Sequence, residues 1–224
     1  MVKGMDRDVS VIIPTLNEEG SIRRVLDAVL PAVGETIVVD GHSSDRTAEI
    51  ARAAGAKVFF DSKGKGSALR KGMALSKGKI IIMMDADGSH RLEELSGMIS
   101  SIRSGFDACF GSRFMQGGGT GDMTMFRKAG NKFFVFLVNL FWGSSYSDLC
   151  YGYRGFSRNA LQRLKLNCDG FGIETEISIQ CAKKGLKVIE IPSYEKPREC
   201  GKGKLRTAQD GFKIFKTIMG ELLA

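Results

Sequence analysis

The sequence predicts an α/β fold in which helices flank a mostly parallel central sheet. Two observations lead to this prediction. Short, almost uninterrupted apolar runs of strand length recur through the first half of the chain, and segments with helical spacing of apolar side chains separate them. Such an alternation is typical of a parallel sheet that is covered on both faces. With 224 residues, 43% of them hydrophobic, the chain is long enough for one sizeable core.

The expected elements of the first half follow one another in a regular order. Strands are expected where apolar residues run together, at 9–13, 36–39, 57–60, 80–84 and 106–110. Helices are expected where apolar side chains recur every three or four residues, at 22–30, 48–54, 67–76 and 92–102. This order is that of a βα repeat.

From Gly117 the pattern changes. A glycine-rich loop, "GGGTGD", precedes an apolar helix expected at 126–142 and the polar turn "GSSYSD". A further helix is expected at 177–182, a strand at 188–191 and an amphipathic helix at 208–222. Neither an internal repeat nor a linker rich in Pro or Ser divides the chain. We therefore expect a single domain over residues 1–224, with a second functional part from about residue 116.

Charge and cysteine pattern narrow the class of protein. Thirty-three Lys and Arg against 25 Asp and Glu give a net charge of +8, which favours an anionic partner: a nucleotide, a phosphorylated lipid, an acidic membrane surface or nucleic acid. Nucleic acid is disfavoured because the basic residues do not alternate with aromatic residues in a recognisable module. The five cysteines include no C-x-x-C pair, so neither a disulfide framework nor a zinc site is indicated. A reducing, cytoplasmic setting is expected.

No segment is expected to span a membrane. The N-terminus lacks a signal-peptide core, and the longest apolar run, 133–142, is too short to cross a bilayer. The segment 127–143 nevertheless combines a basic start, an apolar body and Trp142, which is typical of a helix at a lipid surface. A buried core helix has much the same composition, so both interpretations stay open. The protein is expected in the cytoplasm, either soluble or peripheral on the cytoplasmic face of a membrane.

Two carboxylates directly follow the fourth expected strand, in the stretch "KIIIMMDADGSH". Residues i and i+2 of a strand point to the same side, so Asp85 and Asp87 can aim at one point beyond the sheet if the strand geometry persists. Ligands of open parallel sheets gather at this edge. Hard carboxylate oxygens suit Mg2+ or Mn2+, which share their coordination with substrate phosphates. The two aspartates are therefore candidate metal ligands, and Gly88 beside them is expected to leave backbone room for a ligand.

Polar residues also follow the first and second expected strands. The stretch "PTLNEEG" carries Thr15 and Asn17, and "DGHSSDRT" begins with Asp40. Thr15 or Asn17 can cap the next helix, a local function that competes with ligand binding as an explanation. Asp40 is a stronger ligand candidate, because it ends a strand at the ligand edge.

The stretches "VSVIIPTLNEEGSI", "IVVDGHSSDRT", "GKGSALRKGM", "IIMMDADGSH" and "GSRF", in this order, resemble the nucleotide-sugar domain of family 2 glycosyltransferases with the GT-A fold. The second half, with "SDLCYGYRGFSR", "GFGIETEI" and "IPSYEKPRECGKGKL", is similar to dolichyl-phosphate and other polyprenyl-phosphate sugar synthases. The resemblance covers nearly the whole chain. It implies a metal-dependent hexosyltransferase with a nucleotide-sugar-binding half at 1–115 and an acceptor-side half at 116–224.

The resemblance also implies which residues form the donor site. Asp85 and Asp87 would hold Mn2+ or Mg2+ on the diphosphate, and Asp87 is expected to be catalytic. The nucleotide of a GDP- or UDP-linked sugar would lie among Pro14, Thr15, Asn17, Glu18, Asp40, Lys65, Asp85 and Ala86. The chain departs from many relatives at Gly41 and Ser89, where they carry Asp and Gln. The resemblance therefore assigns neither the base nor a third protein ligand of the metal.

The implied reaction is an inverting transfer of a sugar, with mannose or glucose favoured, to a polyprenyl (dolichyl) phosphate. A phosphate is largely anionic at neutral pH, so it needs cationic positioning more than a general base. The guanidinium fork suits this task. The arginines that match the family's phosphate side best are Arg113 and Arg127, both also expected to be catalytic, and Arg198; further candidates are Arg154, Lys202 and Lys204.

Several assignments stay open at this stage. Glu174 and Glu176 begin an expected helix, where they either favour the helix dipole or lie near the donor sugar or acceptor. His90 is a candidate contact of the diphosphate. The alternatives to a lipid-phosphate transferase are a glycosyltransferase that acts on a soluble glycan and a non-enzymatic nucleotide- or anion-binding protein. A nucleotidyltransferase is excluded, because "PTLNEE" stands where its glycine-rich basic loop belongs.

Overall fold

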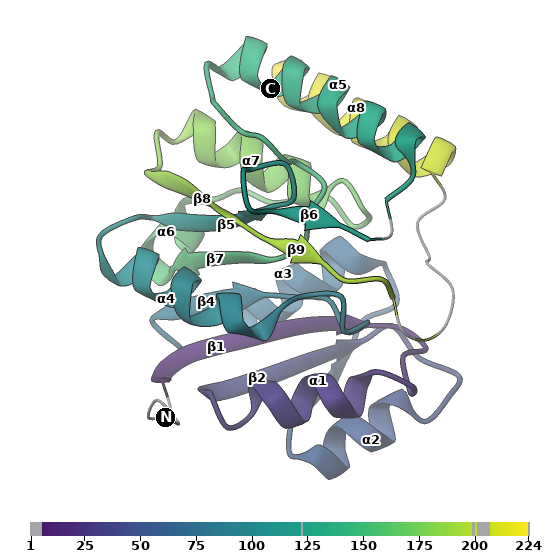
Figure 1. Ribbon diagram of the computed structural model, residues 1–224. Coiled ribbons are helices and arrows are strands. Elements are labelled where there is room, and N and C mark those ends of the chain that lie inside the picture. The colour runs from purple at the N-terminus through teal and green to yellow at the C-terminus, as the bar shows by residue number, and fades with distance from the viewer. Residues whose placement is uncertain (1–5, 122, 199, 201–206, 224) are drawn as a thin grey trace.

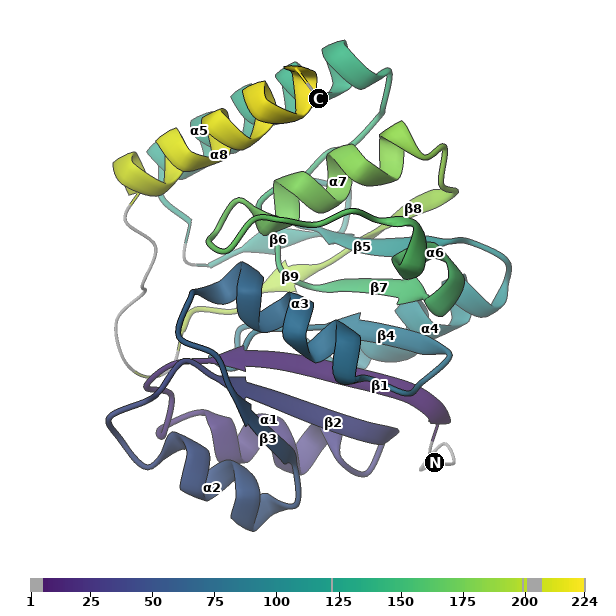
Figure 2. The ribbon, with the colours of Figure 1, turned by 180° about the vertical axis from the view of Figure 1, so that it is seen from behind.

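The central sheet has seven strands in the order β3-β2-β1-β4-β7-β5-β8 (Figures 1 and 2; β3 is labelled in Figure 2). The computed structural model describes residues 6–121, 123–198, 200 and 207–223, and it confirms the α/β fold with a mostly parallel sheet flanked by helices. Six strands lie where the apolar runs predict them: β1 (Asp6–Thr15), β2 (Val33–Asp40), β3 (Lys57–Phe60), β4 (Ile80–Met83), β5 (Ala108–Ser112) and β8 (Val188–Pro192).

The remaining strand of this sheet, β7 (Arg154–Ser157), is not among the expected strands and runs antiparallel to its neighbours. It pairs with β4 on one side and β5 on the other, so it separates two strands that follow each other along the chain. Its sequence "RGFS" has too little apolar character to indicate a buried strand. A strand from the second half of the chain thus completes the sheet of the first half. Two short strands, β6 (Gly119–Thr120) and β9 (Tyr194–Glu195), form a separate pair.

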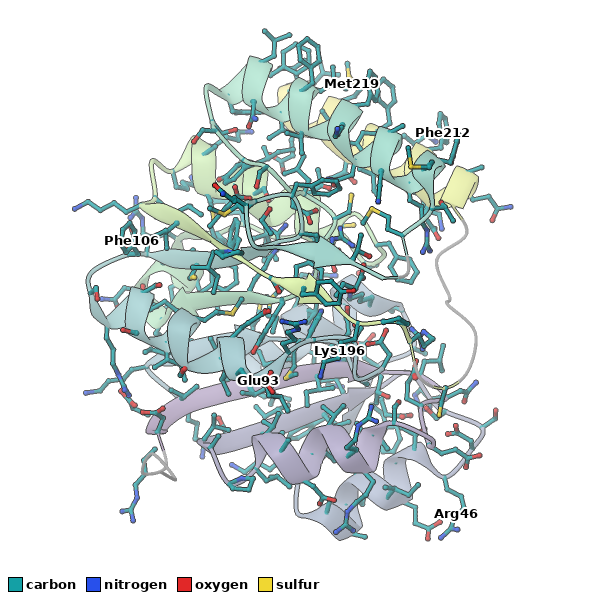
Figure 3. The ribbon with its side chains drawn as sticks, viewed as in Figure 1. Arg46, Glu93, Phe106, Lys196, Phe212 and Met219 are labelled. Carbon is teal, nitrogen blue, oxygen red and sulfur yellow. The ribbon has the colours of Figure 1, made fainter. Side chains whose placement is uncertain are left out.

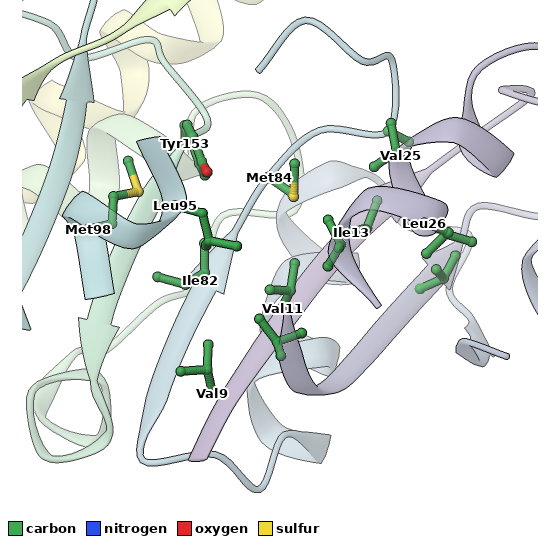
Figure 4. Close-up of a cluster of buried hydrophobic side chains, with 14 of the residues drawn as sticks. Val9, Val11, Ile13, Val25, Leu26, Ile82, Met84, Leu95, Met98 and Tyr153 are labelled. Atoms are coloured by element: carbon green, nitrogen blue, oxygen red, sulfur yellow. The ribbon is translucent and has the colours of Figure 1, made fainter. Parts of the chain in front are cut away.

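Alternate residues of β1 contribute to two hydrophobic cores on opposite faces of the sheet. Val9, Val11 and Ile13 belong to the core drawn in Figure 4. The helices on that face are α1 (Ile22–Val29), α2 (Thr47–Ala54) and, after the short helix η1 (Leu92–Glu94), α4 (Leu95–Arg103). Ile12 belongs to the other core, with α3 (Lys65–Leu75), α6 (Arg158–Arg163) and α7 (Ile173–Lys183). Burial on both faces explains why the strands are continuously apolar.

Two long helices, α5 (Met125–Trp142) and α8 (Thr207–Leu223), lie side by side over α7, farthest from the N-terminal strands (Figure 1 and, from behind, Figure 2). They contribute few side chains to the core: Val138 from α5, and Ile214 and Ile218 from α8. Most of their other large apolar side chains are exposed. Figure 3 labels Phe212 and Met219 on this layer.

Candidate active site

A cavity of about 840 Å³ opens at the carboxyl edge of the sheet and extends to α5 and α8. Of the nine residues assigned to the donor site and the three best-matching arginines, ten line it; the exceptions are Asn17 and Asp40. We call the part lined by residues of the strand ends and of α3 the polar end; it includes Pro14, Thr15, Glu18, Lys65, Asp85, Ala86 and Asp87. The part lined by aromatic and aliphatic residues of α5, α8 and the loop before α7 is the apolar end; it includes Phe126, Phe133, Phe134, Phe171, Ile214 and Phe215.

Asn17 and Asp40 organise the loops beside the cavity. Asn17 has a φ of 49°, a left-handed conformation that Asn tolerates better than most residues. Its Oδ1 accepts the N–H of Ser44 at 2.8 Å, which links the loops after β1 and β2. The buried carboxylate of Asp40 accepts the N–H and the hydroxyl of Ser43 at 2.7 and 2.6 Å. The expected capping of α1 by Thr15 or Asn17 is wrong, because the N-cap of this helix is Ser21, which makes no side-chain cap bond.

Asp85 and Asp87 both line the polar end, although not through strand geometry. The strand β4 ends at Met83, and the two aspartates lie in the turn that follows. Gly88 adopts a φ of 76° in this turn, and a Cβ there would meet Arg24 Nη2 at 2.4 Å. The expected open space at Gly88 is therefore filled by an arginine, and this glycine is required by the backbone instead.

Asp85 belongs to a chain of ion pairs with two other residues. Lys65 Nζ lies 2.7 Å from Asp85 Oδ1 and 2.8 Å from Glu174 Oε1. Burial alone would lower the pKa of Lys65, but the two carboxylates raise it above its usual value. Burial would likewise raise the pKa of Asp85, yet Lys65 and His90 lower it to about 2. A Cβ on Gly152 would meet both Asp85 and Lys65 at about 3 Å, so only glycine leaves room for this pair.

His90 supports Asp85 from within the core and does not line the cavity. Its ring stacks on Tyr153 with centroids 4.7 Å apart, and its Nδ1 accepts the Asp85 N–H at 3.2 Å. Nε2 lies 3.7 Å from Asp85 Oδ2 and has no hydrogen-bond partner among the described residues. The expected contact of His90 with a diphosphate is therefore indirect, through Asp85.

Asp87 is held by Arg198, one of the three predicted acceptor arginines. Arg198 Nη2 lies 2.9 Å from Asp87 Oδ2, and its Nη1 lies 2.8 Å from Glu18 Oε1. The other oxygen of Asp87, Oδ1, accepts the N–H of Ser89 at 3.0 Å. Burial opposes the charge of Arg198, but Glu18 and Asp87 raise its pKa above the usual value. Each aspartate of the D-x-D motif is thus paired with one cation that also contacts a glutamate.

Arg113 also lines the cavity, and its guanidinium is fully engaged. Nε and Nη2 donate to the two oxygens of the fully buried Asp148 at 2.7 and 2.9 Å, and Nη1 donates to Glu195 at 3.1 Å. Asp148 and Glu195 fix this side chain at the cavity wall. Arg113 and Asp148 are 35 positions apart, so no local motif in the sequence indicates this pair.

The other candidate cations differ in their surroundings. Arg127, in the first turn of α5, lines the cavity, and within the described residues its guanidinium has no carboxylate partner. Arg154 is 1% exposed; it donates to the carbonyls of Leu149 and Tyr151 and stacks over Phe110, so the expectation that it binds phosphate is wrong. The candidates Lys202 and Lys204 lie outside the described residues.

The residues at the polar end fit a divalent metal ion that shares its coordination with a ligand. Asp85 and Asp87 direct hard oxygens to one cavity, and in the described part of the chain no group of three His, Cys, Asp or Glu side chains completes a metal cage. Such a pair leaves the remaining positions to phosphate oxygens or water, as Mg2+ and Mn2+ sites do. Thr15 Oγ1 is a further buried oxygen at the cavity that lacks a partner among the described residues.

Glu174 is the residue at the polar end for which the sequence left two interpretations open. It stands in the first turn of α7, as an acid that favours the helix dipole does, and it also lines the cavity and binds Lys65. Its neighbour Glu176 instead accepts the N–H groups of Asn167 and Cys168 at 2.8 and 3.0 Å, which is a structural function.

The sequence and the fold are both similar to those of known proteins. Residues 10–165 match the sequence model of glycosyl transferase family 2. The glycosyltransferase AglJ of Haloferax volcanii is 34% identical over 211 residues, which cover 92% of this chain and 69% of that protein. A dolichyl-phosphate hexose transferase of the same organism is 30% identical over 216 residues, which cover 95% of this chain and 92% of that protein.

Among solved structures, glucosyl-3-phosphoglycerate synthase from Mycobacterium tuberculosis, in complex with Mn2+, UDP and glucosyl-3-phosphoglycerate, resembles this chain with a TM-score of 0.76. The match covers 96% of this chain and 80% of that one. At 21% identity it shows the shared fold alone.

Proposed function

This chain belongs to glycosyl transferase family 2, and we propose that it moves a hexose from a nucleotide sugar to a polyprenyl phosphate. One observation carries the proposal: a single cavity joins an end with two carboxylates to an end lined by phenylalanines, and Arg113, Arg127 and Arg198 line the same cavity. A nucleoside diphosphate suits the first end and a hydrocarbon chain with an anionic head suits the second. The similarity to a dolichyl-phosphate hexose transferase of nearly the same length supports the same acceptor class.

We assign the donor to the polar end, which residues 1–115 mostly build. Asp85 and Asp87 would hold Mn2+ or Mg2+, and the bound ion would stabilise the charge of the leaving nucleoside diphosphate. Pro14, Thr15, Glu18 and Ala86 line the space beside them for the GDP or UDP part, and Lys65 adds a cation. Asn17 and Asp40 contribute indirectly to the donor site, because they hold the loops after β1 and β2 in place.

We assign the acceptor to the apolar end, which residues 116–224 mostly build. Arg127 is the best placed phosphate ligand, because its guanidinium has no competing carboxylate among the described residues. Arg198, which lines the cavity and binds Asp87, is the second, while Arg113 contributes its charge from a fixed position. A phosphate oxygen, already anionic, attacks the anomeric carbon as the bond to the diphosphate oxygen breaks, so no side chain has to remove a proton.

We further propose that the outer surface of α5 and α8 lies on a membrane. This α5–α8 face carries exposed apolar side chains, among them Phe136 and Leu140 at 60% and 61% exposure, and the exposed Lys132, Lys213 and Lys216. Apolar side chains flanked by lysines suit a bilayer with anionic headgroups. The apolar end of the cavity is lined by the same two helices, so a lipid phosphate would enter from this side. In the described chain, no helix is both long and apolar enough to cross a bilayer.

The test is a transfer assay with a panel of radiolabelled GDP- and UDP-sugars, a short-chain polyprenyl phosphate and, in parallel, a neutral soluble glycan as acceptors. We expect label to pass to the lipid phosphate with one donor and only when Mn2+ or Mg2+ is present. Robust transfer to the neutral glycan alone would instead indicate a soluble-glycan transferase. Binding of the nucleotide without transfer to either acceptor would indicate a binding protein.

A further inference from the structure

Both aspartates of the D-x-D motif share their cation with a glutamate. Lys65 Nζ bridges Asp85 and Glu174 at 2.7 and 2.8 Å. Arg198 bridges Asp87 and Glu18 at 2.9 and 2.8 Å. The two bridges come from different elements, α3 and the segment after β9, yet they have the same arrangement of candidate metal ligand, cation and second acid.

The net charge of these six groups equals in size, and opposes, the charge of one divalent ion. Four carboxylates and two cations sum to −2, a deficit that Mn2+ or Mg2+ would cancel. A metal that binds Asp85 and Asp87 competes with the cations that now hold these oxygens. A buried cation that loses its only partner is strongly disfavoured. Each cation here already contacts a second carboxylate, so it can release the aspartate and stay paired.

We propose that Glu18 and Glu174 are positioning residues that retain Arg198 and Lys65 when Asp87 and Asp85 take up the metal; this inference rests on the metal-dependent function proposed above. Both glutamates are well placed to hold a cation. Glu174 is 4% exposed and lies in the first turn of α7, and Glu18 is 7% exposed and fixed through its N–H to Thr47 Oγ1 at 2.8 Å. Without metal, the two cations neutralise the aspartates and hold the site in its folded arrangement. Because the metal must compete with these cations, its affinity in the absence of nucleotide is lower.

The first experiment is a titration of the full chain with Mn2+ in the absence of nucleotide, with free Mn2+ followed by electron paramagnetic resonance. Arg198→Gln and Lys65→Gln each remove one competitor, and we expect each to raise the affinity for Mn2+ about tenfold. Arg127→Gln is the matched control, since it removes the same charge from the same cavity without freeing an aspartate. We expect it to change the affinity by no more than about twofold, as a screened charge does.

A double-mutant cycle then tests the glutamates. Glu18→Gln leaves Arg198 with Asp87 alone, and we expect the affinity for Mn2+ to fall about tenfold. In the Arg198→Gln background the same substitution should have little effect, because there is no cation left to retain. Glu174→Gln and Lys65→Gln form the second cycle, and a thermal melt of each variant checks that it is folded.

Two results would overturn the inference. One is a glutamate substitution that costs the same Mn2+ affinity with and without its cation, because the glutamate then acts by its own charge. The other is a rise in Arg198→Gln no larger than that in Arg127→Gln. In either case transfer by the wild type would be unaffected and the proposed function would stand. Absence of Mn2+ binding in wild type and all variants, with UDP or GDP added, would overturn both the inference and the metal dependence.

Discussion

The two ends of the cavity differ in whether their charged side chains are ion-paired. At the polar end, Asp85, Asp87 and both neighbouring cations are tied into ion pairs shorter than 3 Å. At the apolar end, Arg127 stands among phenylalanines, and its guanidinium has no carboxylate partner in the described chain. A preorganised cluster of ion pairs suits the binding of a metal together with a nucleoside diphosphate, which must be exchanged in every turnover. A cation without a carboxylate partner, beside phenylalanine side chains, suits an amphiphile whose head group alone is charged.

The largest effect should come from the polar end. We expect Asp87→Asn to lower the rate of transfer by about three orders of magnitude, which corresponds to about 4 kcal/mol of lost stabilisation of the leaving group. The fold should persist, because Asp87 lies in a turn at the cavity and supports no core. The transfer assay measures the rate, and calorimetry with UDP or GDP and Mn2+ measures whether the nucleotide still binds with the metal. Wild-type affinity for the nucleotide in both Asp85→Asn and Asp87→Asn would show that neither aspartate holds a metal on which nucleotide binding depends.

The next effect separates the two arginines that were expected to act alike. Arg127→Ala should lower transfer to a polyprenyl phosphate by about two orders of magnitude, as the loss of one preorganised charge-stabilising group does, and leave donor affinity unchanged. Arg113→Ala should instead lower the free energy of unfolding by about 3–5 kcal/mol, because it leaves the fully buried Asp148 unpaired. Donor titrations, transfer rates and urea denaturation of both variants decide this. Equal losses of activity at unchanged stability would contradict the distinction.

A smaller effect tests whether the apolar end opens towards lipid. Each large apolar side chain that enters a bilayer contributes about 1.5–3 kcal/mol, so Phe136→Ser with Leu140→Ser should reduce binding to anionic liposomes at least about tenfold. Flotation at low and high salt is the measurement, and salt should weaken binding through the lysines. Leu75→Ser on α3, an exposed apolar residue away from the α5–α8 face, is the control. Equal flotation of all three proteins would show that the face does not bind lipid.

Trp142 illustrates why this face could not be derived from composition. The sequence allowed 127–143 to be either a lipid-facing or a core helix, and in the structure one side of α5 is buried in the core while the other side is exposed. Val138 is buried in the second core and Trp142 packs against it, whereas Phe136 and Leu140 are exposed. The helical period fixes which side chains share a face, but only the packing of α7 and α8 determines which face is covered.

The fold likewise has features that depend on neighbouring residues in the sequence and features that depend on contacts between distant segments. Six strands and the motifs that follow β1, β2 and β4 could be predicted, because an apolar run and the polar residue that ends it are adjacent in sequence. The strand β7 could not, since its burial depends on β4 and β5 on either side. Of the nine residues assigned to the donor site, all but Asn17 and Asp40 line one cavity, and these two side chains are used by neighbouring loops. The candidates His90 and Arg154 are buried and do not line it.

The pairing of charges was the least predictable feature of the site. Arg198 and Glu18 are 180 positions apart, and Arg113 and Glu195 are 82 apart. No periodicity or local motif links residues at such separations. The sequence therefore indicates which groups carry charge at the cavity, and only the folded chain shows that Arg113 is committed to carboxylates and that Arg127 is not.

The smallest effect concerns the acid stability of the polar end. Because Lys65 and its surroundings lower the pKa of Asp85 to about 2, the ionised carboxylate stabilises the folded state above its ordinary pKa, and this contribution is lost as the pH falls through about 2. Asp85→Asn lacks it at every pH. Urea denaturation of both proteins should therefore show a difference of about 1–2 kcal/mol that is constant from pH 8 to 5 and shrinks between about pH 4 and pH 2. Glu176, whose pKa is raised by burial, titrates in both proteins and cancels from the difference. A difference that stays constant down to pH 2 would mean that the Lys65–Asp85 pair adds nothing to stability, and that the polar end is held by Lys65–Glu174 alone.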